Sequence, residues 1–139
     1  MKSPNEFTSA YAKAVREASV EAYVNLYDND VRIFDLWDDW SAQGIESCRT
    51  MAKEWFLSLG TEHVVVTFSE IEVSTDSQFA SITGFVRFAG HAADGKQLRF
   101  LDERISVVLK KQTSGEWKVT HQHTSAPIGS ADMRIKMVK

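Results

Sequence analysis

The chain has 139 residues, with sixteen Lys and Arg against nineteen Asp and Glu, which gives a formal net charge of −3 at pH 7. Hydrophobic residues make up 43% of the chain, and only seven Gly and two Pro are present, so disordered and collagen-like architectures are excluded. This length predicts a single domain over residues 1–139, with a core over 1–128 and a short basic tail over 129–139.

The first sixty residues are predicted to contain three helices and one strand. Residues 3–6 have the sequence of a capping box, which begins the first helix, and Ser19 is a second N-cap followed by a shorter helix. Residues 31–36 have the apolar character of a strand. Gly44 precedes a third helix with apolar residues at helical spacing, and Gly60 suits its C-terminal end.

The remainder of the chain is predicted to be an antiparallel meander of four strands. These strands cover residues 63–74, 79–91, 97–111 and 116–126, and turn sequences separate them. Two of them are much longer than a typical strand of about 5–6 residues, so we expect them to bend or to carry bulges. Three helices followed by one curved sheet define an α+β fold in which the helices cover a single face.

Several classes of partner and cofactor are not expected for this sequence. The chain lacks the basic excess that binding to nucleic acid needs. No apolar run approaches the ~20 residues of a membrane span, and no signal-peptide segment follows Met1, so we expect no membrane partner and a cytoplasmic protein. The single cysteine, Cys48, excludes an internal disulfide and a Cys-rich zinc site. We also expect no metal and no cofactor, since no phosphate loop, dinucleotide fingerprint or zincin helix is present.

The last predicted strand carries the most specific motif of the chain. Residues 117–127, with the sequence WKVTHQHTSAP, follow a Ser-Gly turn and resemble the ending of the SnoaL-like proteins. These proteins belong to the nuclear transport factor 2-like superfamily. That superfamily also includes the ketosteroid isomerases and the association domain of calcium/calmodulin-dependent kinases, which has a similar His-x-His-x-Ser ending. The resemblance implies a cone in which a curved antiparallel sheet wraps three helices and leaves a pocket at its open end.

Residues 19–27 and 31–35 resemble the segment of the ketosteroid isomerases that delivers the catalytic aspartate. This resemblance implies that Asp35 is the general base, and the same register places Tyr11 on the oxyanion-hole tyrosine. The alternative roles are an exposed aspartate that holds a turn and a tyrosine of the core. The third isomerase element, a protonated aspartate on the penultimate strand, has no match, because Ser106 stands near that place.

Two histidines and an arginine on the last two strands are further candidates. His121 and His123 are two residues apart, so they are expected to share the face that forms either the pocket lining or a dimer surface. We assign His121 as a catalytic acid, base or donor and His123 as a ligand contact, while a metal would need a third ligand. Arg104 must meet a ligand anion or a counter-charge such as Asp102.

Aromatic residues supply the candidate lining of a small and largely apolar pocket. The ligand-binding candidates of this type are Trp37, Trp40, Trp55 and Phe56.

These residues together favour a small-molecule pocket protein. The predicted function is that of a cofactor-independent isomerase, cyclase or dehydratase, in which Asp35 acts as general base on a small apolar carbonyl compound. The alternative is a non-catalytic ligand-binding or oligomerisation module like the kinase association domain. In both cases we expect a homodimer, because a sheet face with Val64, Val66 and Phe68 exposed would leave a large apolar patch.

Overall fold

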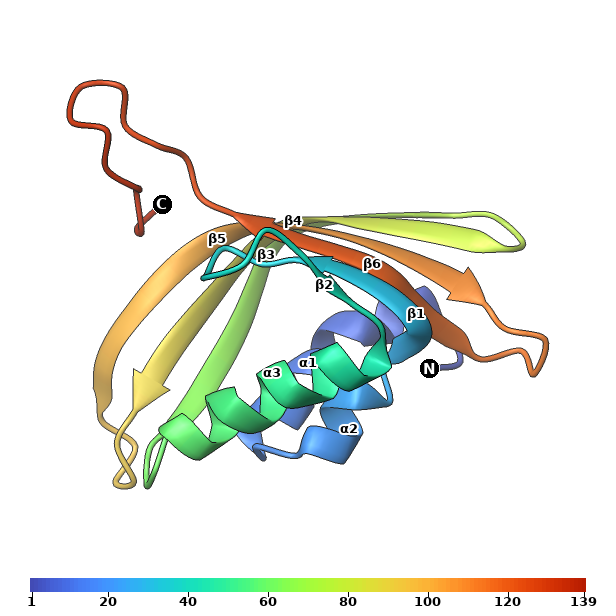
Figure 1. The fold of residues 1–139 in the computed structure, drawn as a ribbon, viewed down its shortest axis with the longest axis horizontal. Coiled ribbons are helices and arrows are strands. Elements are labelled where there is room, and N and C mark those ends of the chain that lie inside the picture. The colour runs from blue at the N-terminus through green and yellow to red at the C-terminus, as the bar shows by residue number, and fades with distance from the viewer.

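A computed structural model describes all residues from 1 to 139 as one curved sheet with helices on its concave side (Figure 1). The helical elements are the 3-10 turn Pro4–Glu6 and the helices α1 (Phe7–Arg16), α2 (Val20–Val24) and α3 (Ile45–Ser58). The strands are β1 (Tyr27–Phe34), β2 (Ala42–Gln43), β3 (His63–Thr75), β4 (Phe79–His91), β5 (Gln97–Lys111) and β6 (Trp117–Ser125). The predicted α+β fold is confirmed.

The helix starts follow from their capping residues. Ser3 and Glu6 form the predicted capping box. The Ser3 hydroxyl accepts a hydrogen bond from the backbone of the first turn, and the Glu6 carboxylate accepts one from the backbone N–H of Ser3. The Ser19 hydroxyl accepts a hydrogen bond from the backbone N–H of Ala22 at 3.2 Å and begins α2. Between these helices Ala18 adopts a left-handed conformation with φ of 49°, so α1 ends at Arg16.

The sheet has the strand order β2-β1-β6-β5-β4-β3. The meander from β3 to β6 is antiparallel, as predicted, and its strand boundaries agree with the prediction to within one residue. However, β1 runs parallel to β6, which makes the sheet mixed rather than wholly antiparallel. Strand β1 also begins at Tyr27, four residues before the strand predicted at 31–36, and β2 was not predicted.

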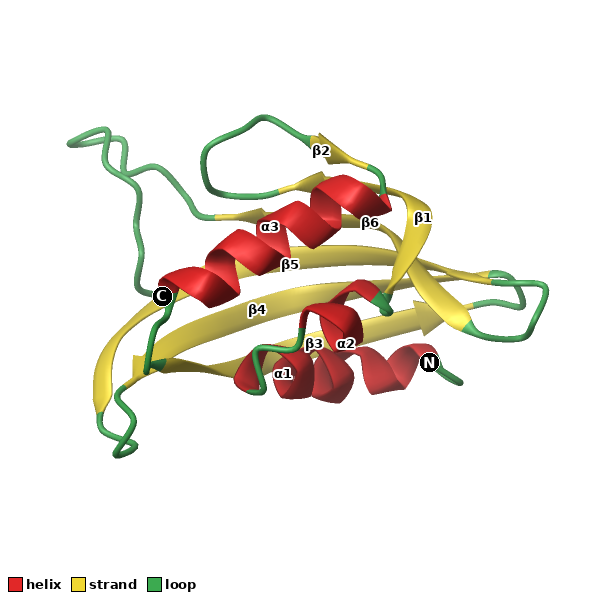
Figure 2. Ribbon diagram, turned by 60° about the horizontal axis from the view of Figure 1, so that its bottom comes forward, coloured by secondary structure: helices red, strands yellow, loops and turns green.

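Bulges produce the curvature of the sheet over the helices (Figure 2). In β3 the register shifts between Ser69 and Glu72, where Glu70 has a φ of 51°. The residue opposite this shift is Gly84. A side chain is not accommodated there, because its Cβ would lie 3.0 Å from the Ser69 carbonyl oxygen. A second shift lies in β6 opposite Val108 and Leu109, and it leaves Thr120 without a register partner.

The core fills the narrow part of the concave side. The side chains of Phe7, Ile105, Leu109 and Val119 are 2% exposed or less and belong to one cluster between helix α1 and the sheet. Strand β3 also contributes to this core, because Val64 and Val66 are buried and Phe68 packs against the cluster. The apolar patch expected from these three residues is therefore absent, because their side chains point toward α1 and not outward.

The C-terminal tail folds back onto the edge of β5 that β6 leaves free. The backbone N–H of Asp102 donates to the Met137 carbonyl oxygen at 2.7 Å, and the Lys139 N–H donates to a carboxylate oxygen of Asp102 at 2.9 Å. Arg87 donates two further hydrogen bonds to the same carboxylate, and both Arg87 and the Lys139 N–H hold the pKa of Asp102 below its ordinary value. The longest helix, α3, has fourteen residues, and no helix combines the length and apolar character that a membrane crossing needs.

Candidate functional site

A cavity of about 1000 Å³ opens at the wide end of the concave side. Every helix contributes to its wall, as do the loop 35–41 and all strands except β3. The sheet side is lined by Phe88 of β4, Leu101 and Glu103 of β5, and Gln122 and Thr124 of β6. A volume of this size is at the upper end of the ~300–1,000 Å³ usual for small-molecule sites.

Asp35 lies directly after β1 and lines this cavity. Its Oδ1 accepts a hydrogen bond from the Thr124 hydroxyl at 3.0 Å, which fixes the carboxylate against the neighbouring strand β6. The side chain is half-buried, and the loop 35–41 that follows it forms part of the rim. The structure therefore places Asp35 where a bound molecule could reach its second oxygen.

Glu103 is the site residue that sequence reasoning missed. It is only 5% exposed, it lines the same cavity, and its Oε1 has no hydrogen-bond partner. Burial and the nearby charge of Asp35 raise the pKa of Glu103 from its ordinary 4.5 to about 7. The alternation along the strand did indicate that Glu103 points inward, since alternate residues share a face and Glu103 is in phase with the buried residues Ile105 and Val107.

Three tyrosines form a buried row from the cavity into the core. The ring centroids of Tyr11 and Tyr23 are 5.4 Å apart, and those of Tyr23 and Tyr27 are 5.1 Å apart. Burial raises the pKa of Tyr11 well above its ordinary value, and the Tyr23 hydroxyl and the charges of Asp35 and Glu103 raise it further. Tyr11 therefore stays neutral and can act as a hydrogen-bond donor.

Gln122 closes the row of tyrosines. The Tyr27 hydroxyl donates to Gln122 Oε1 at 2.7 Å, which leaves the Gln122 amide NH₂ as the group free to donate into the cavity. Cys48 lies nearby on α3 but is 1% exposed, and burial raises the pKa of its thiol to about 12. The thiol is therefore protonated and is not a nucleophile.

Two of the four predicted aromatic contacts line the cavity. Trp37 of the rim loop and Trp55 of α3 contribute to its wall. In contrast, Trp40 is 97% exposed and does not line the cavity. Phe56 follows Trp55 on α3 and is turned into the core by the 100° step of the helix, where it packs on Tyr23.

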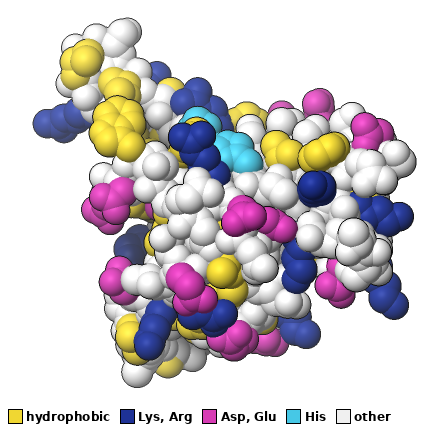
Figure 3. All heavy atoms as spheres, turned by 45° about the vertical axis from the view of Figure 1, so that its right-hand side comes forward, with side chains coloured by type: hydrophobic (Ala, Val, Ile, Leu, Met, Phe, Trp, Pro, Cys, Tyr) yellow, Lys and Arg dark blue, Asp and Glu magenta, His cyan; other side chains and the backbone are white.

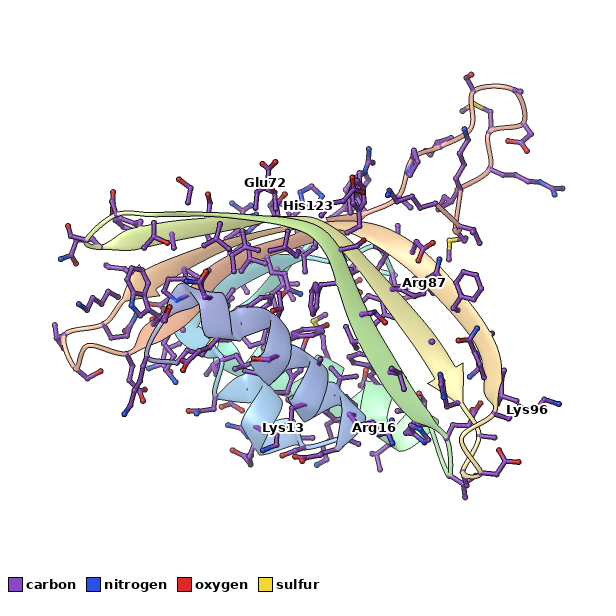
Figure 4. The ribbon with its side chains drawn as sticks, turned by 180° about the vertical axis from the view of Figure 1, so that it is seen from behind. Lys13, Arg16, Glu72, Arg87, Lys96 and His123 are labelled. Atoms are coloured by element: carbon purple, nitrogen blue, oxygen red, sulfur yellow. The ribbon has the colours of Figure 1, made fainter.

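His121 and His123 do not line the cavity, because both imidazoles lie on the outer face of the sheet, so the pocket position expected for them is not found. His121 Nδ1 is 2.7 Å from the Arg32 carbonyl oxygen, and both rings pack edge-on against Phe34. Figure 4 shows His123 pointing away from the helices, and Figure 3 shows histidine side chains at the surface beside Lys and Arg. The cause is the bulge at Thr120, which shifts the inward face of β6 from the predicted phase to Gln122.

Arg104 also lies outside the cavity. It alternates with the inward-facing Glu103 and Ile105, so its side chain is on the outer face, where its Nε donates to the Ser125 hydroxyl at 3.0 Å. There it lines a separate hollow of about 290 Å³ beneath the C-terminal tail. Arg104 is therefore not placed to contact a ligand of the main cavity.

Groups able to ligate a metal do not gather in this protein. No three or more His, Cys, Asp or Glu side chains are arranged to hold a metal ion. The carboxylates of the cavity are instead spread over β5, α3 and the loop 35–41.

The curved sheet around the helices, with the cavity at its wide end, defines a cone-shaped α+β fold of the nuclear transport factor 2-like type. A SnoaL-like domain model matches residues 5–129, so the chain belongs to the SnoaL-like family. No curated protein matches the chain.

Solved structures agree with this assignment. An NTF2-like protein of unknown function from Pseudomonas putida has a TM-score of 0.82 at 19% identity, covering 96% of this chain and 90% of that one. A putative calcium/calmodulin-dependent protein kinase II association domain from Xanthomonas campestris has a TM-score of 0.74 at 17% identity, with coverage of 88% and 84%. A ketosteroid isomerase-like protein from Erwinia carotovora has a TM-score of 0.62 at 21% identity, with coverage of 84% and 88%.

Proposed function

We propose that the protein binds an apolar carbonyl compound in this cavity and catalyses proton transfer at the carbon next to the carbonyl group. Isomerisation, aldol-type cyclisation and dehydration all pass through such a step. The observation that carries the proposal is the convergence of Asp35, Glu103 and Tyr11 on one largely buried cavity.

In the proposed mechanism the two carboxyl groups have different protonation states. Asp35 is hydrogen-bonded by Thr124 and acts as the general base that removes the α-proton. Glu103 is protonated below about pH 7, so with Tyr11 it donates a hydrogen bond to the oxygen on which negative charge develops. A buried carboxylic acid beside a second carboxylate is suited to a donor role for the acid and a base role for the carboxylate. This chemistry needs no cofactor.

The test is deuterium exchange at the α-carbon of a simple probe ketone, 2-tetralone, followed by NMR in D₂O. We expect the exchange rate to fall by at least about a hundredfold in Asp35→Asn, because general-base catalysis contributes about 10²–10⁴. The affinity for the probe is expected to stay within a few-fold, since the two side chains have the same shape. Glu72→Gln is the matched control, because Glu72 is exposed on the opposite face of the sheet (Figure 4). Equal exchange in Asp35→Asn and in the unaltered protein would contradict the proposed role.

A second candidate function is that of a homodimeric binding module without catalysis. The observation that favours it is an apolar C-terminal tail, in which Ile128, Met133, Ile135 and Val138 are 46–76% exposed. Contact with a second copy of the chain would cover these side chains. Light scattering tests this proposal: a dimer that Ile135→Asp converts to monomer supports it, and a monomeric unaltered protein contradicts it.

A further inference from the structure

The wall of the main cavity has an unusual distribution of charge. Six carboxylic acids line it, namely Asp35, Asp38, Asp39, Glu46, Glu54 and Glu103. The chain contains sixteen Lys and Arg and four His, and none of them lines the cavity. The separate hollow beneath the tail is different, because Arg104, Lys136 and Lys139 contribute to its wall.

The carboxylates at the rim are not neutralised by the protein. Asp38 and Asp39 of the loop 35–41 and Glu54 of α3 are exposed and form no ion pair. Glu46 Oε2 lies 3.6 Å from Arg49 Nε, but this arginine also pairs with Glu21, which does not line the cavity. The entrance is therefore a region of negative potential next to a low-dielectric interior, an arrangement that attracts cations and repels anions.

A second observation, independent of the acidic rim, also indicates a ligand. It is the buried carboxyl group of Glu103, which lacks a hydrogen-bond partner for one oxygen. Glu103 is 95% buried, since only 5% of its surface is exposed; it lines the cavity, and its Oε1 has no hydrogen-bond partner. A buried polar atom without a partner is costly, so a polar group of a bound molecule is the natural partner for it. This places the polar end of a ligand deep in the cavity, beside Asp35.

Aromatic rings line the same cavity as the rim carboxylates and the buried carboxyl groups. Tyr11, Tyr23, Trp37, Trp55 and Phe88 all line the cavity. Trp37 is half-exposed and belongs to the same loop as Asp38 and Asp39. An indole face beside carboxylates is a favourable environment for an alkylammonium group, which gains both charge pairing and a cation–π contact.

From this arrangement we propose that the natural ligand is an amphipathic amine: an apolar carbonyl compound that carries a basic nitrogen at its outer end. The ammonium group lies at the rim against Asp38, Asp39 and Glu54, and the carbonyl end reaches Glu103 and Asp35. Carboxylates, phosphates and other anionic compounds are disfavoured. This inference rests on the proposed function for the carbonyl end of the ligand, but the charge selection is independent of catalysis.

The experiment uses three probes of similar size and different charge. They are 2-acetylnaphthalenes with an aminomethyl, a hydroxymethyl or a carboxyl group at position 6, which are cationic, neutral and anionic at pH 7. Calorimetric titration at low salt is expected to give about tenfold tighter binding for the amine than for the alcohol, and weaker binding still for the acid. Added salt should reduce this difference, because the rim is exposed to solvent.

Variants assign the selection to the rim. Combining Asp38→Asn, Asp39→Asn and Glu54→Gln should bring the amine and the alcohol to within about threefold of each other. Asn suits the left-handed backbone of Asp38, which has a φ of 62°, and Glu46 is left unchanged because it is in the first turn of α3. Glu72→Gln is the control and should keep the full preference.

Three results would overturn the inference: no binding of the amine, equal or tighter binding of the alcohol or acid, or an amine preference that survives the triple substitution. Failure of the proposed catalysis is distinguishable, since it would remove deuterium exchange and leave the charge preference unaltered. Conversely, exchange that depends on Asp35 without any charge preference would support the catalysis and overturn the inference.

Discussion

The two halves of strand β5 differ in character although their inward faces are continuous. Ile105, Val107 and Leu109 are 2% exposed or less and pack in the aliphatic part of the core. Two residues before Ile105, the same face carries Glu103, which lines the cavity with an unpartnered oxygen. The narrow end of the concave side, here called the closed end, is apolar. The wide end, where the cavity opens, is called the open end, and it contains ionisable groups at comparable burial.

This comparison shows that the site is an extension of the core face. The strands that build the core also hold the functional groups, so the carboxyl of Glu103 is fixed by the same ladder as Leu109. Placing functional groups on rigid strands keeps their geometry defined. Residues of the closed end are expected to raise the free energy of unfolding. The buried ionisable groups of the open end are expected to lower it, because a site suited to catalysis is less stable than a packed apolar core.

The sharpest test of this division is truncation at the closed end. Leu109→Ala removes a side chain that is 0% exposed and should lower the free energy of unfolding by about 2–5 kcal/mol. Leu101→Ala, on the same face but lining the cavity, should cost less, because the space that it opens is already continuous with solvent. Urea denaturation measures both values, and equal losses would show that the two ends do not differ.

The open end should show its cost in the pH dependence of stability. The folded pKa of Glu103, about 7, lies above its ordinary 4.5, so the folded state binds the proton more tightly. The contribution of the protonated group is fully present below pH 4.5 and is lost as the pH rises through 7, amounting to roughly 3 kcal/mol at most. Urea unfolding between pH 4.5 and 8 should show this decline, and Glu103→Gln should remove it. Glu72→Gln should retain it, and an unchanged decline in Glu103→Gln would contradict the burial of this carboxyl as an acid.

The boundary between the two ends can be probed at the Tyr27 hydroxyl. Tyr27→Phe leaves the buried oxygen of Gln122 without its donor and should cost about 1–3 kcal/mol of unfolding free energy. A double-mutant cycle with Gln122→Leu isolates the hydrogen bond, because the second substitution removes its acceptor. Additive effects of the two substitutions would show that this bond does not couple the tyrosine row to β6.

The smallest effect is expected at the outside of the rim loop. Trp40 is 97% exposed, so Trp40→Ala should change the free energy of unfolding by less than about 0.5 kcal/mol. It should also leave the affinity for the acetylnaphthalene probes unaltered, whereas Trp37→Ala should weaken it, because only Trp37 lines the cavity. A loss of affinity in Trp40→Ala alone would mean that the loop closes over the ligand.

Most of the fold could be predicted from the sequence because its signals are local. Capping residues located the helix starts, and alternation with turn sequences located the long strands. Strand β2 could not be predicted, since two residues carry no periodicity. The parallel pairing of β1 with β6 was also hidden, because residues almost ninety positions apart meet in it.

The candidate site residues that were predicted correctly lie outside strand β6, whose bulge at Thr120 could not be seen in the sequence. Asp35, Tyr11, Trp37 and Trp55 were named from the sequence and line the cavity. The histidines were assigned to the pocket although they lie outside it, because Thr120 gives no sign in its residue type that it interrupts the alternation. Glu103 was missed since a charged residue within a strand suggests the solvent face, and only the phase of its neighbours indicates the opposite.

The bulge at Thr120 has a consequence for how such a protein could diverge. Deleting Thr120 would make this part of β6 regular, with Val119 still opposite Leu109 and His121 still opposite Val108, so Gln122 and Thr124 would stay on the cavity wall. The faces exchange only if Thr120 is kept and takes the place opposite Val108, because His121 and His123 would then point toward the cavity. A slip of one residue in the register would thus exchange an amide and a hydroxyl for two imidazoles without any substitution, giving a lineage access to different chemistry in one step.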